Sequence, residues 1–127
     1  MKGIFIHDTR SVPYALAIAQ GYKTIETRFR DVLGRFVGQR VNVIRTRSGR
    51  PAEVVGSVVI TGKWFCRPEQ FDEFSNRHCI PTGSRYDCHG RGKWCYDLSD
   101  PVALDHPVPL SSFRVSHKTR SFAIIDA

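Results

Sequence analysis

The sequence lacks a long apolar run: no stretch approaches the roughly 18 consecutive apolar residues that a membrane-spanning helix needs. Its first residues, MKGIFIHD, reach Asp8 too soon to contain the apolar core of a secretory signal peptide. It also contains no internal repeat and no low-complexity segment. These absences argue against a membrane protein and against a disordered or fibrous chain, and they predict a soluble protein of the cytoplasm.

Closely spaced cysteine pairs are absent as well. The four cysteines are 13, 9 and 7 positions apart, so none forms the CxxC pair that zinc sites usually supply. Without a secretory signal, disulfides are not expected either. A structural zinc site remains the alternative to free thiols, because His89 directly follows the third cysteine. We expect no metal, no cofactor and four free thiols, which are Cys66, Cys79, Cys88 and Cys95.

Acidic residues are few. Nineteen Lys and Arg stand against twelve Asp and Glu, which gives a formal net charge of +7, and fourteen of the nineteen cations are Arg. Residues 28–50 contain seven Arg and one acid, Asp31, a local net charge of +6. The guanidinium group is a planar fork that suits phosphates, carboxylates and base edges. The charge therefore predicts an acidic polymer as partner, most commonly a nucleic acid, and a basic face without a partner is the alternative.

What the sequence does contain is a series of short strands separated by glycines and prolines. Apolar runs and apolar alternation predict five of them, at residues 2–7, 23–28, 40–47, 53–60 and 121–126. Gly56 lies inside the fourth strand and predicts a bulge or a sharp bend there. At 127 residues the chain suits one domain, spanning residues 1–127. The pattern predicts an α+β fold: a small β-barrel of five or six strands with two or so decorating helices.

Two helices are predicted between these strands. The first spans residues 12–20, with Ser11 as its N-cap and Gly21 as its stop. The second spans residues 67–78 and begins with a proline in its first turn. Residues 80–94 form a long loop rich in glycine and cations. Residues 100–112 contain three prolines and are expected to run extended along the surface.

The segment GYKTIETRFR, residues 21–30, places one acid among several cations. Glu26 and Arg28 are two apart on one strand, so they share a face and can pair, which would keep the carboxylate ionised. An ionised Glu26 can accept a hydrogen bond from the amino group of a base, while Lys23 and Arg28 can hold a phosphate or a base carbonyl. The alternative is a surface ion pair that contributes less than about 1 kcal/mol.

The longer stretch PYALAIAQGYKTIETRFR, with its helix, its Gly-x-Lys and its Glu-x-Arg, resembles the signature of the ASCH domain family. The resemblance covers residues 11–30 and implies a small PUA-like β-barrel. It also implies a positively charged cleft beside the GxKxxExR motif and a role in RNA binding. Carried over residue by residue, the cleft positions are Gly21, Lys23, Glu26 and Arg28.

The resemblance also raises the possibility of an enzyme. One branch of the family, the small bacterial acetylcytidine amidohydrolases, is understood to use a Lys, a Thr three residues later and a distant Glu. Lys23 matches the Lys, but Glu26 stands at the Thr position, and Thr24 and Thr27 are out of register, so the nucleophile is missing. Other ASCH proteins have been linked to ribonuclease activity, and for that chemistry Lys23, Glu26 and Tyr14 are the candidate acids and bases.

A second candidate site is the long loop. It interleaves cations with aromatic rings, a composition that single-strand binding uses, because charge holds the backbone and each stacked base contributes about 1 to 3 kcal/mol. The alternative for the tryptophan is that it anchors the loop to the core. The candidate residues are Arg85, Tyr86, Arg91, Lys93 and Trp94. Together the two sites predict binding of RNA, single-stranded by preference, or of a nucleotide; the alternative is a hydrolase acting on RNA or on a modified nucleoside.

Overall fold

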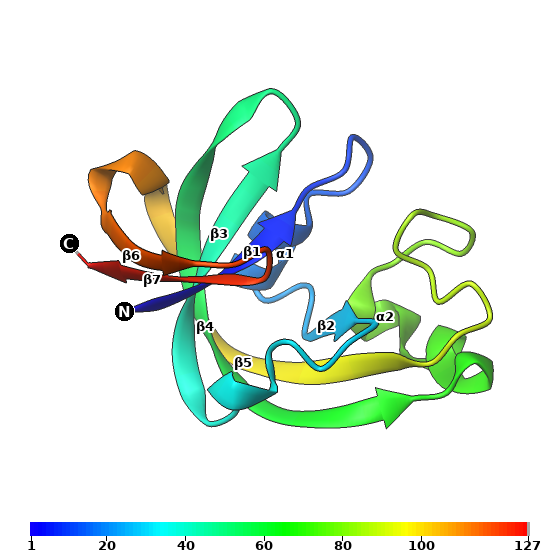
Figure 1. Ribbon diagram of the computed structural model, residues 1–127. Coiled ribbons are helices and arrows are strands. Elements are labelled where there is room, and N and C mark those ends of the chain that lie inside the picture. The colour runs from blue at the N-terminus through cyan, green and yellow to red at the C-terminus, as the bar shows by residue number, and fades with distance from the viewer. Residues whose placement is uncertain (127) are drawn as a thin grey trace.

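The computed structural model describes residues 1–126 of the 127-residue chain and shows one curved, seven-stranded sheet (Figure 1). Its strands are β1 (Lys2–His7), β2 (Ile25–Arg28), β3 (Gln39–Arg47), β4 (Arg50–Cys66), β5 (Lys93–Pro109), β6 (Arg114–Lys118) and β7 (Phe122–Asp126). Their order in the sheet is β2-β5-β4-β3-β1-β7-β6. β1 and β3 run parallel, and the other neighbouring strands run antiparallel.

The predicted barrel of five or six strands is wrong in strand number and in closure. Within residues 1–126, β2 and β6 form the two edges of the sheet and do not pair with each other, so the sheet stays open. The sheet is strongly curved, as Figure 1 shows, so its two ends lie around a common interior although they are not hydrogen-bonded to each other. The α+β class and the small helical content agree with the prediction.

One strand is longer than predicted because a segment that contains three prolines belongs to it. The segment at 100–109, expected as surface chain, forms the second half of β5 and pairs with β4. β2 covers only residues 94–97 of β5, so the other edge of this second half is open. Proline lacks an N–H and is tolerated at such an edge, which accounts for Pro101, Pro107 and Pro109.

The first helix, α1 (Tyr14–Ala19), lies where it was predicted but is shorter at both ends. Ser11 makes no cap. Instead Thr9 Oγ1 accepts a hydrogen bond from the Val12 N–H at 3.1 Å, and Asp8 Oδ1 accepts one from the Ala15 N–H at 2.9 Å. The predicted stop is confirmed, because Gly21 has a φ of +85°, which a residue with a side chain rarely adopts.

The second predicted helix is mostly of another type. Residues 68–74 form a 3₁₀ helix, η2 (Pro68–Phe74), and an α-helical turn, α2 (Ser75–His78), follows directly. A 3₁₀ helix has three residues per turn, so Phe71 and Phe74 fall on one side, against the core. Two further 3₁₀ turns are η1 (Gly34–Phe36) and η3 (Leu110–Ser112). None of the helices in the described part of the chain has the length and apolarity needed to cross a bilayer.

The larger core lies between α1 and one face of the sheet. α1 packs against β1, β3, β4 and β5, and this packing buries Ile18 completely. Gly56 makes the close approach possible: a Cβ there would lie 2.8 Å from the Ala19 Cβ and 2.2 Å from the Val102 carbonyl oxygen. The strand register shifts beside Gly56, so the predicted bulge is confirmed. A smaller cluster, which includes Ile125, covers the opposite face.

Candidate functional site

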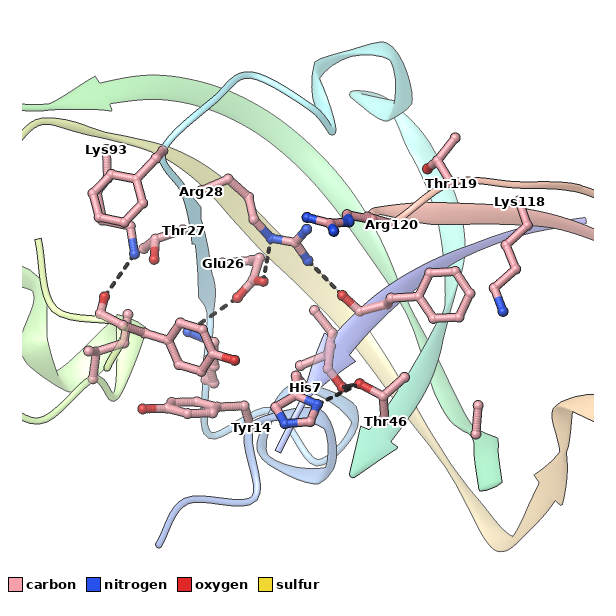
Figure 2. Close-up of a pocket in the computed structure, with 17 residues that line it drawn as sticks. His7, Tyr14, Glu26, Thr27, Arg28, Thr46, Lys93, Lys118, Thr119 and Arg120 are labelled. Carbon is pink, nitrogen blue, oxygen red and sulfur yellow. Dashed lines mark hydrogen bonds and ion pairs between the residues drawn. The ribbon is translucent and has the colours of Figure 1, made fainter. Parts of the chain in front are cut away.

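A cavity of about 460 Å³ opens beside β2 (Figure 2). Its walls come from β1, α1, β2, the loop that precedes β5, and the turn between β6 and β7. We call it the β2 cavity. Six of the residues singled out from the sequence line it: Tyr14, Lys23, Glu26, Arg28, Tyr86 and Lys93.

Glu26 lies at the centre of a charged cluster in this cavity (Figure 2). Its Oε2 accepts a hydrogen bond from Arg28 Nε at 2.9 Å, and its Oε1 lies 3.5 Å from Lys23 Nζ. Arg28 Nη2 donates to the Phe5 carbonyl oxygen at 2.7 Å, which ties the cluster to β1. Glu26 is only 8% exposed and Lys23 only 2%. The predicted pairing of Glu26 with Arg28 is therefore present, and the alternative of a solvated surface pair is wrong.

Burial and charge shift the pKa values of this cluster. Burial alone would raise the pKa of Glu26, but the positive charges of Arg28 and Lys23 outweigh it and hold that pKa below its ordinary value. Burial lowers the pKa of Lys23, and the carboxylate of Glu26 offsets only part of this effect. Burial likewise lowers the pKa of Lys93 to about 8, although the charge of Glu26 acts in the opposite direction. The carboxylate is thus held ionised among amines that bind their protons weakly.

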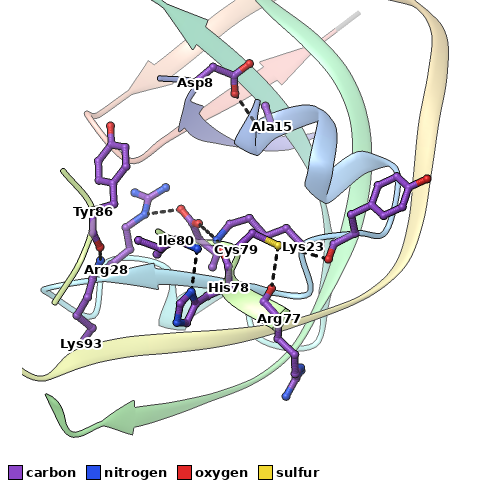
Figure 3. Close-up of polar contacts among 12 residues, drawn as sticks. Asp8, Ala15, Lys23, Arg28, Arg77, His78, Cys79, Ile80, Tyr86 and Lys93 are labelled. Atoms are coloured by element: carbon purple, nitrogen blue, oxygen red, sulfur yellow. Dashed lines mark hydrogen bonds and ion pairs between the residues drawn. The ribbon is translucent and has the colours of Figure 1, made fainter. Parts of the chain in front are cut away.

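The position of Lys23 depends on a buried histidine that the sequence did not reveal. Lys23 Nζ donates to the His78 carbonyl oxygen at 2.5 Å. The His78 ring accepts the Ile80 N–H at Nδ1, at 2.9 Å (Figure 3), so its proton resides on Nε2, which lies 2.9 Å from the Phe71 carbonyl oxygen. Burial lowers the pKa of His78. A neutral imidazole therefore fixes the turn whose carbonyl group holds Lys23.

The long loop contributes two of its five candidate residues to the cavity. Lys93 Nζ donates to the Tyr86 carbonyl oxygen at 2.8 Å, which fastens the loop to the start of β5 (Figure 3). The Tyr86 ring meets the Tyr14 ring edge to face, with centroids 5.7 Å apart. The Arg91 guanidinium lies over the Phe29 ring, 4.4 Å from its centroid. Phe29 lines the cavity, but Arg91 is not among the residues that line it.

Other candidates lie elsewhere. Trp94 is partly buried and packs against the larger core, so the anchoring alternative holds for it. Its ring also meets the ring of the exposed Phe65 edge to face, with centroids 5.4 Å apart. Gly21 does not line the cavity, and a Cβ at this position would lie 3.1 Å from the side chain of Pro101. Gly21 instead has a structural role, because it ends α1. Arg85 does not line the β2 cavity either; it lines a neighbouring groove.

Sequence reasoning missed several residues of the cavity. Lys118, at the end of β6, and Arg120, in the turn between β6 and β7, reach it from a part of the chain far from β2. The basic run SHKTR, residues 116–120, was the available signal, but nothing in it indicates a contact with β2. His7 also lines the cavity, with Nδ1 3.0 Å from Thr46 Oγ1. Thr27, expected on the strand face opposite Glu26, lines the cavity as well.

The cavity is strongly cationic and partly aromatic. Glu26 is the one carboxylate among the described residues that line it, and it faces five cations: Lys23, Arg28, Lys93, Lys118 and Arg120. Rings line the same space, from Phe5, Tyr14, Phe29 and Tyr86. Such a wall can hold an anionic group beside a flat aromatic one.

None of the four cysteines is among the described residues that line the β2 cavity. All four are free; Cys66, Cys88 and Cys95 are buried, and Cys79 is partly buried. Burial raises the pKa of Cys95 to about 12, so its thiol stays protonated. Over residues 1–126, no three His, Cys, Asp or Glu side chains are grouped closely enough to hold a metal ion.

Comparison with known proteins gives a clear result for structure. No protein-family model matches the sequence, and no curated protein matches it significantly. The crystal structure of the ASCH protein of Zymomonas mobilis matches with a TM-score of 0.68 and 20% identity, over 86% of this chain and 74% of that one. A serine-to-alanine mutant of that protein matches with a TM-score of 0.67 and 20% identity, over 86% of this chain and 75% of its own. Its tyrosine-to-phenylalanine mutant matches with a TM-score of 0.67 and 20% identity, over 87% of this chain and 78% of its own. The chain therefore has the ASCH fold that the resemblance in residues 11–30 implies.

Proposed function

We propose that the chain is a single ASCH domain of the PUA-like superfamily that binds RNA, single-stranded by preference, or a nucleotide, in the β2 cavity. One observation carries the proposal: five cations and one ionised carboxylate share a cavity of about 460 Å³ with aromatic rings. This volume lies in the range of about 300 to 1,000 Å³ that is usual for small-ligand sites. The cavity is therefore suited to one nucleotide.

In the proposed complex each kind of group has its own role. Lys118 and Arg120 are exposed and meet the phosphate, whose negative charge they attract. The rings of Tyr14 and Tyr86 contact the base, because flat rings stack with any base. Glu26 accepts a hydrogen bond from an exocyclic amino group, since its lowered pKa keeps it ionised at neutral pH.

Fluorescence anisotropy with a short single-stranded RNA tests the proposal. The logarithm of the binding constant is expected to fall with the logarithm of salt concentration, with a slope of about −0.7 for each phosphate contacted. Lys118→Gln and Arg120→Gln should each weaken binding and make the slope shallower. Arg114→Gln removes an exposed cation from β6, outside the cavity, and is the matched control. Absence of binding at low salt, or binding that ignores salt, would overturn the proposal.

A hydrolase is the second candidate, acting on RNA or on a modified nucleoside. The observation in its favour is the contact between Lys23 Nζ and Glu26 Oε1 at 3.5 Å, combined with burial that lowers the pKa of the amine. A buried amine with a lowered pKa can exchange protons nearer neutral pH, as general acid–base catalysis requires. Tyr14 lies beside this pair, with Lys23 Nζ 5.3 Å from its ring centroid.

Turnover distinguishes the second candidate from simple binding. The protein is incubated with short RNAs and with acylated nucleosides, and the products are identified by mass spectrometry. Lys23→Met should abolish any product, whereas Lys63→Met, a change at an exposed lysine outside the cavity, should not. If no product forms, or if Lys23→Met remains active, the hydrolase hypothesis fails.

A further inference from the structure

A second and larger hollow adjoins the β2 cavity. It has a volume of about 1160 Å³ and shares His7, Tyr14 and Tyr86 with the β2 cavity, so the two are adjacent at these side chains. Its walls are the segment between β1 and α1, the turn between β3 and β4, and the first half of the long loop. Five arginines line it, and we call it the arginine groove: Arg10, Arg45, Arg47, Arg50 and Arg85.

Three of these arginines are available to a ligand. Arg45 and Arg47 both pair with Glu53, at 3.0 and 2.7 Å. By contrast Arg10, Arg50 and Arg85 are exposed, and within residues 1–126 they form no ion pair. Exposed guanidinium groups without a counter-charge are suited to phosphates, which they can bind through two parallel hydrogen bonds.

The acid that lines the groove does not neutralise it. Asp8 is only 7% exposed, and its Oδ1 accepts the Ala15 N–H at 2.9 Å (Figure 3), so this carboxylate serves the start of α1. The exposed part of the groove is therefore positive. A ligand that follows it must be an anion with charges distributed along its length.

We propose that the arginine groove holds the phosphodiester backbone of an RNA strand whose neighbouring nucleotide occupies the β2 cavity. This inference rests on the function proposed above and makes it more specific: the ligand is a nucleotide within a strand and not a free nucleotide. The groove volume, about 1160 Å³, exceeds what a single small ligand needs, whereas the cavity volume does not. The strand passes Tyr14 and Tyr86, and the Arg85 guanidinium lies over the Tyr86 ring, 5.3 Å from its centroid. Charge for the backbone and rings for the bases is the arrangement that single-strand binding requires.

The salt dependence sets the size of the expected effect. A slope of about 0.7 per phosphate means that each contact tightens binding about fivefold when salt falls from 1 M to 0.1 M. Removal of the three available arginines should therefore weaken binding of an RNA strand about a hundredfold at 0.1 M salt. The salt slope should fall by about 2 in the same variant. Binding of a mononucleotide should not change, because it does not reach the groove.

The test compares two triple variants with the unmodified protein. Affinities for a mononucleotide and for a single-stranded RNA of about eight nucleotides, within the usual site size, are measured by calorimetry over a range of salt concentrations. The groove variant carries Arg10→Gln, Arg50→Gln and Arg85→Gln. Its control lowers the net charge equally, at exposed arginines outside both hollows: Arg40→Gln, Arg67→Gln and Arg114→Gln. Circular dichroism verifies that both variants are folded.

Each outcome bears on one proposal or the other. A loss of strand affinity in the groove variant alone, with mononucleotide binding intact, supports the inference. If the strand binds no tighter than the mononucleotide, or if both triple variants lose affinity equally, the inference is overturned while the proposed function stands. If neither ligand binds the unmodified protein, the proposed function is overturned and the inference with it. An acidic peptide that binds the groove as tightly as RNA of equal charge would also overturn the inference.

Discussion

Replacing Lys93 with Met removes an ammonium group that lies buried at the edge of the β2 cavity. The side chain is 2% exposed, and burial lowers its pKa to about 8 from a model-compound value of 10.5. Between these two pH values the unfolded chain holds the proton more firmly than the folded one. The stability of the unmodified protein therefore rises with pH across this window, by at most about 1.4 kcal/mol per pH unit.

The magnitude follows from the two pKa values. Integrated from pH 7 to pH 10, the titration of Lys93 increases the free energy of unfolding by about 2.5 kcal/mol. Met has a similar volume and no charge, so this contribution vanishes in the variant. The lost hydrogen bond to the Tyr86 carbonyl oxygen lowers the stability of the variant by about 1 to 3 kcal/mol. The pH dependence separates the two effects, because only the titration varies strongly with pH.

Urea unfolding, followed by circular dichroism from pH 7 to pH 10, measures the effect. The free energy of unfolding of the unmodified protein minus that of Lys93→Met should rise by about 2.5 kcal/mol over this range. Lys63→Met is the control, since it removes a lysine whose side chain is 41% exposed and lies outside the cavity. A difference that changes by less than about 0.5 kcal/mol across the range would refute the reasoning.

Three further changes test the surroundings of the cavity. Glu26→Gln leaves buried cations without their counter-charge and should lower the free energy of unfolding by about 3 to 5 kcal/mol at pH 7. Because the pKa of Glu26 is lowered in the fold, this loss should shrink as the pH falls below 4.5, and equal stabilities at pH 7 would contradict it. Gly56→Ala places a Cβ 2.2 Å from the Val102 carbonyl oxygen and should destabilise by about 1 to 3 kcal/mol or more. Gly62→Ala is the control, because its Cβ would lie 3.7 Å from the nearest atom, and it should leave the free energy of unfolding nearly unchanged. An equal loss of stability in both variants would argue against a specific clash at Gly56. His78→Phe leaves two backbone groups unpaired and should lower the melting temperature through a loss of about 2 kcal/mol or more; an unchanged melting temperature would show that the ring bonds are dispensable.

The fold was predictable wherever local pattern decides the structure. Alternation located β1, β3 and β7, and Gly21 marked the end of α1, because these depend on a few consecutive residues. The second half of β5 was missed, since its prolines are tolerated only because β2 leaves one edge uncovered. Closure into a barrel was predicted wrongly for a related reason. It depends on whether β2 and β6 meet, and no local periodicity contains that information.

For the site, too, only the contacts between residues close in sequence could be predicted. The two-residue period of a strand brings Glu26 and Arg28 together, and the turn after the helix brings Lys23 beside them. Lys118 and Arg120 come from the opposite end of the chain, and only the curvature of the sheet carries them to β2. His78 holds Lys23 through its backbone carbonyl group and fixes the turn through its ring, and no local pattern in the sequence indicates either contact.

The buried charges beneath the cavity are not explained by stability. Replacement of buried charged groups with apolar side chains of similar volume is often neutral or stabilising, so folding alone would favour apolar residues at positions 23 and 93. Glu26 is the one carboxylate among the described cavity residues, so Lys23, Arg28 and Lys93 remain in excess. Departures of this kind from local folding rules concentrate at functional sites. The phosphate proposed to meet Lys118 and Arg120 would bring negative charge into the same cavity, and it would bind the folded chain in preference to the unfolded one. Binding of the ligand would then also increase the stability of the folded chain, because the ligand offsets the excess positive charge of the cavity wall.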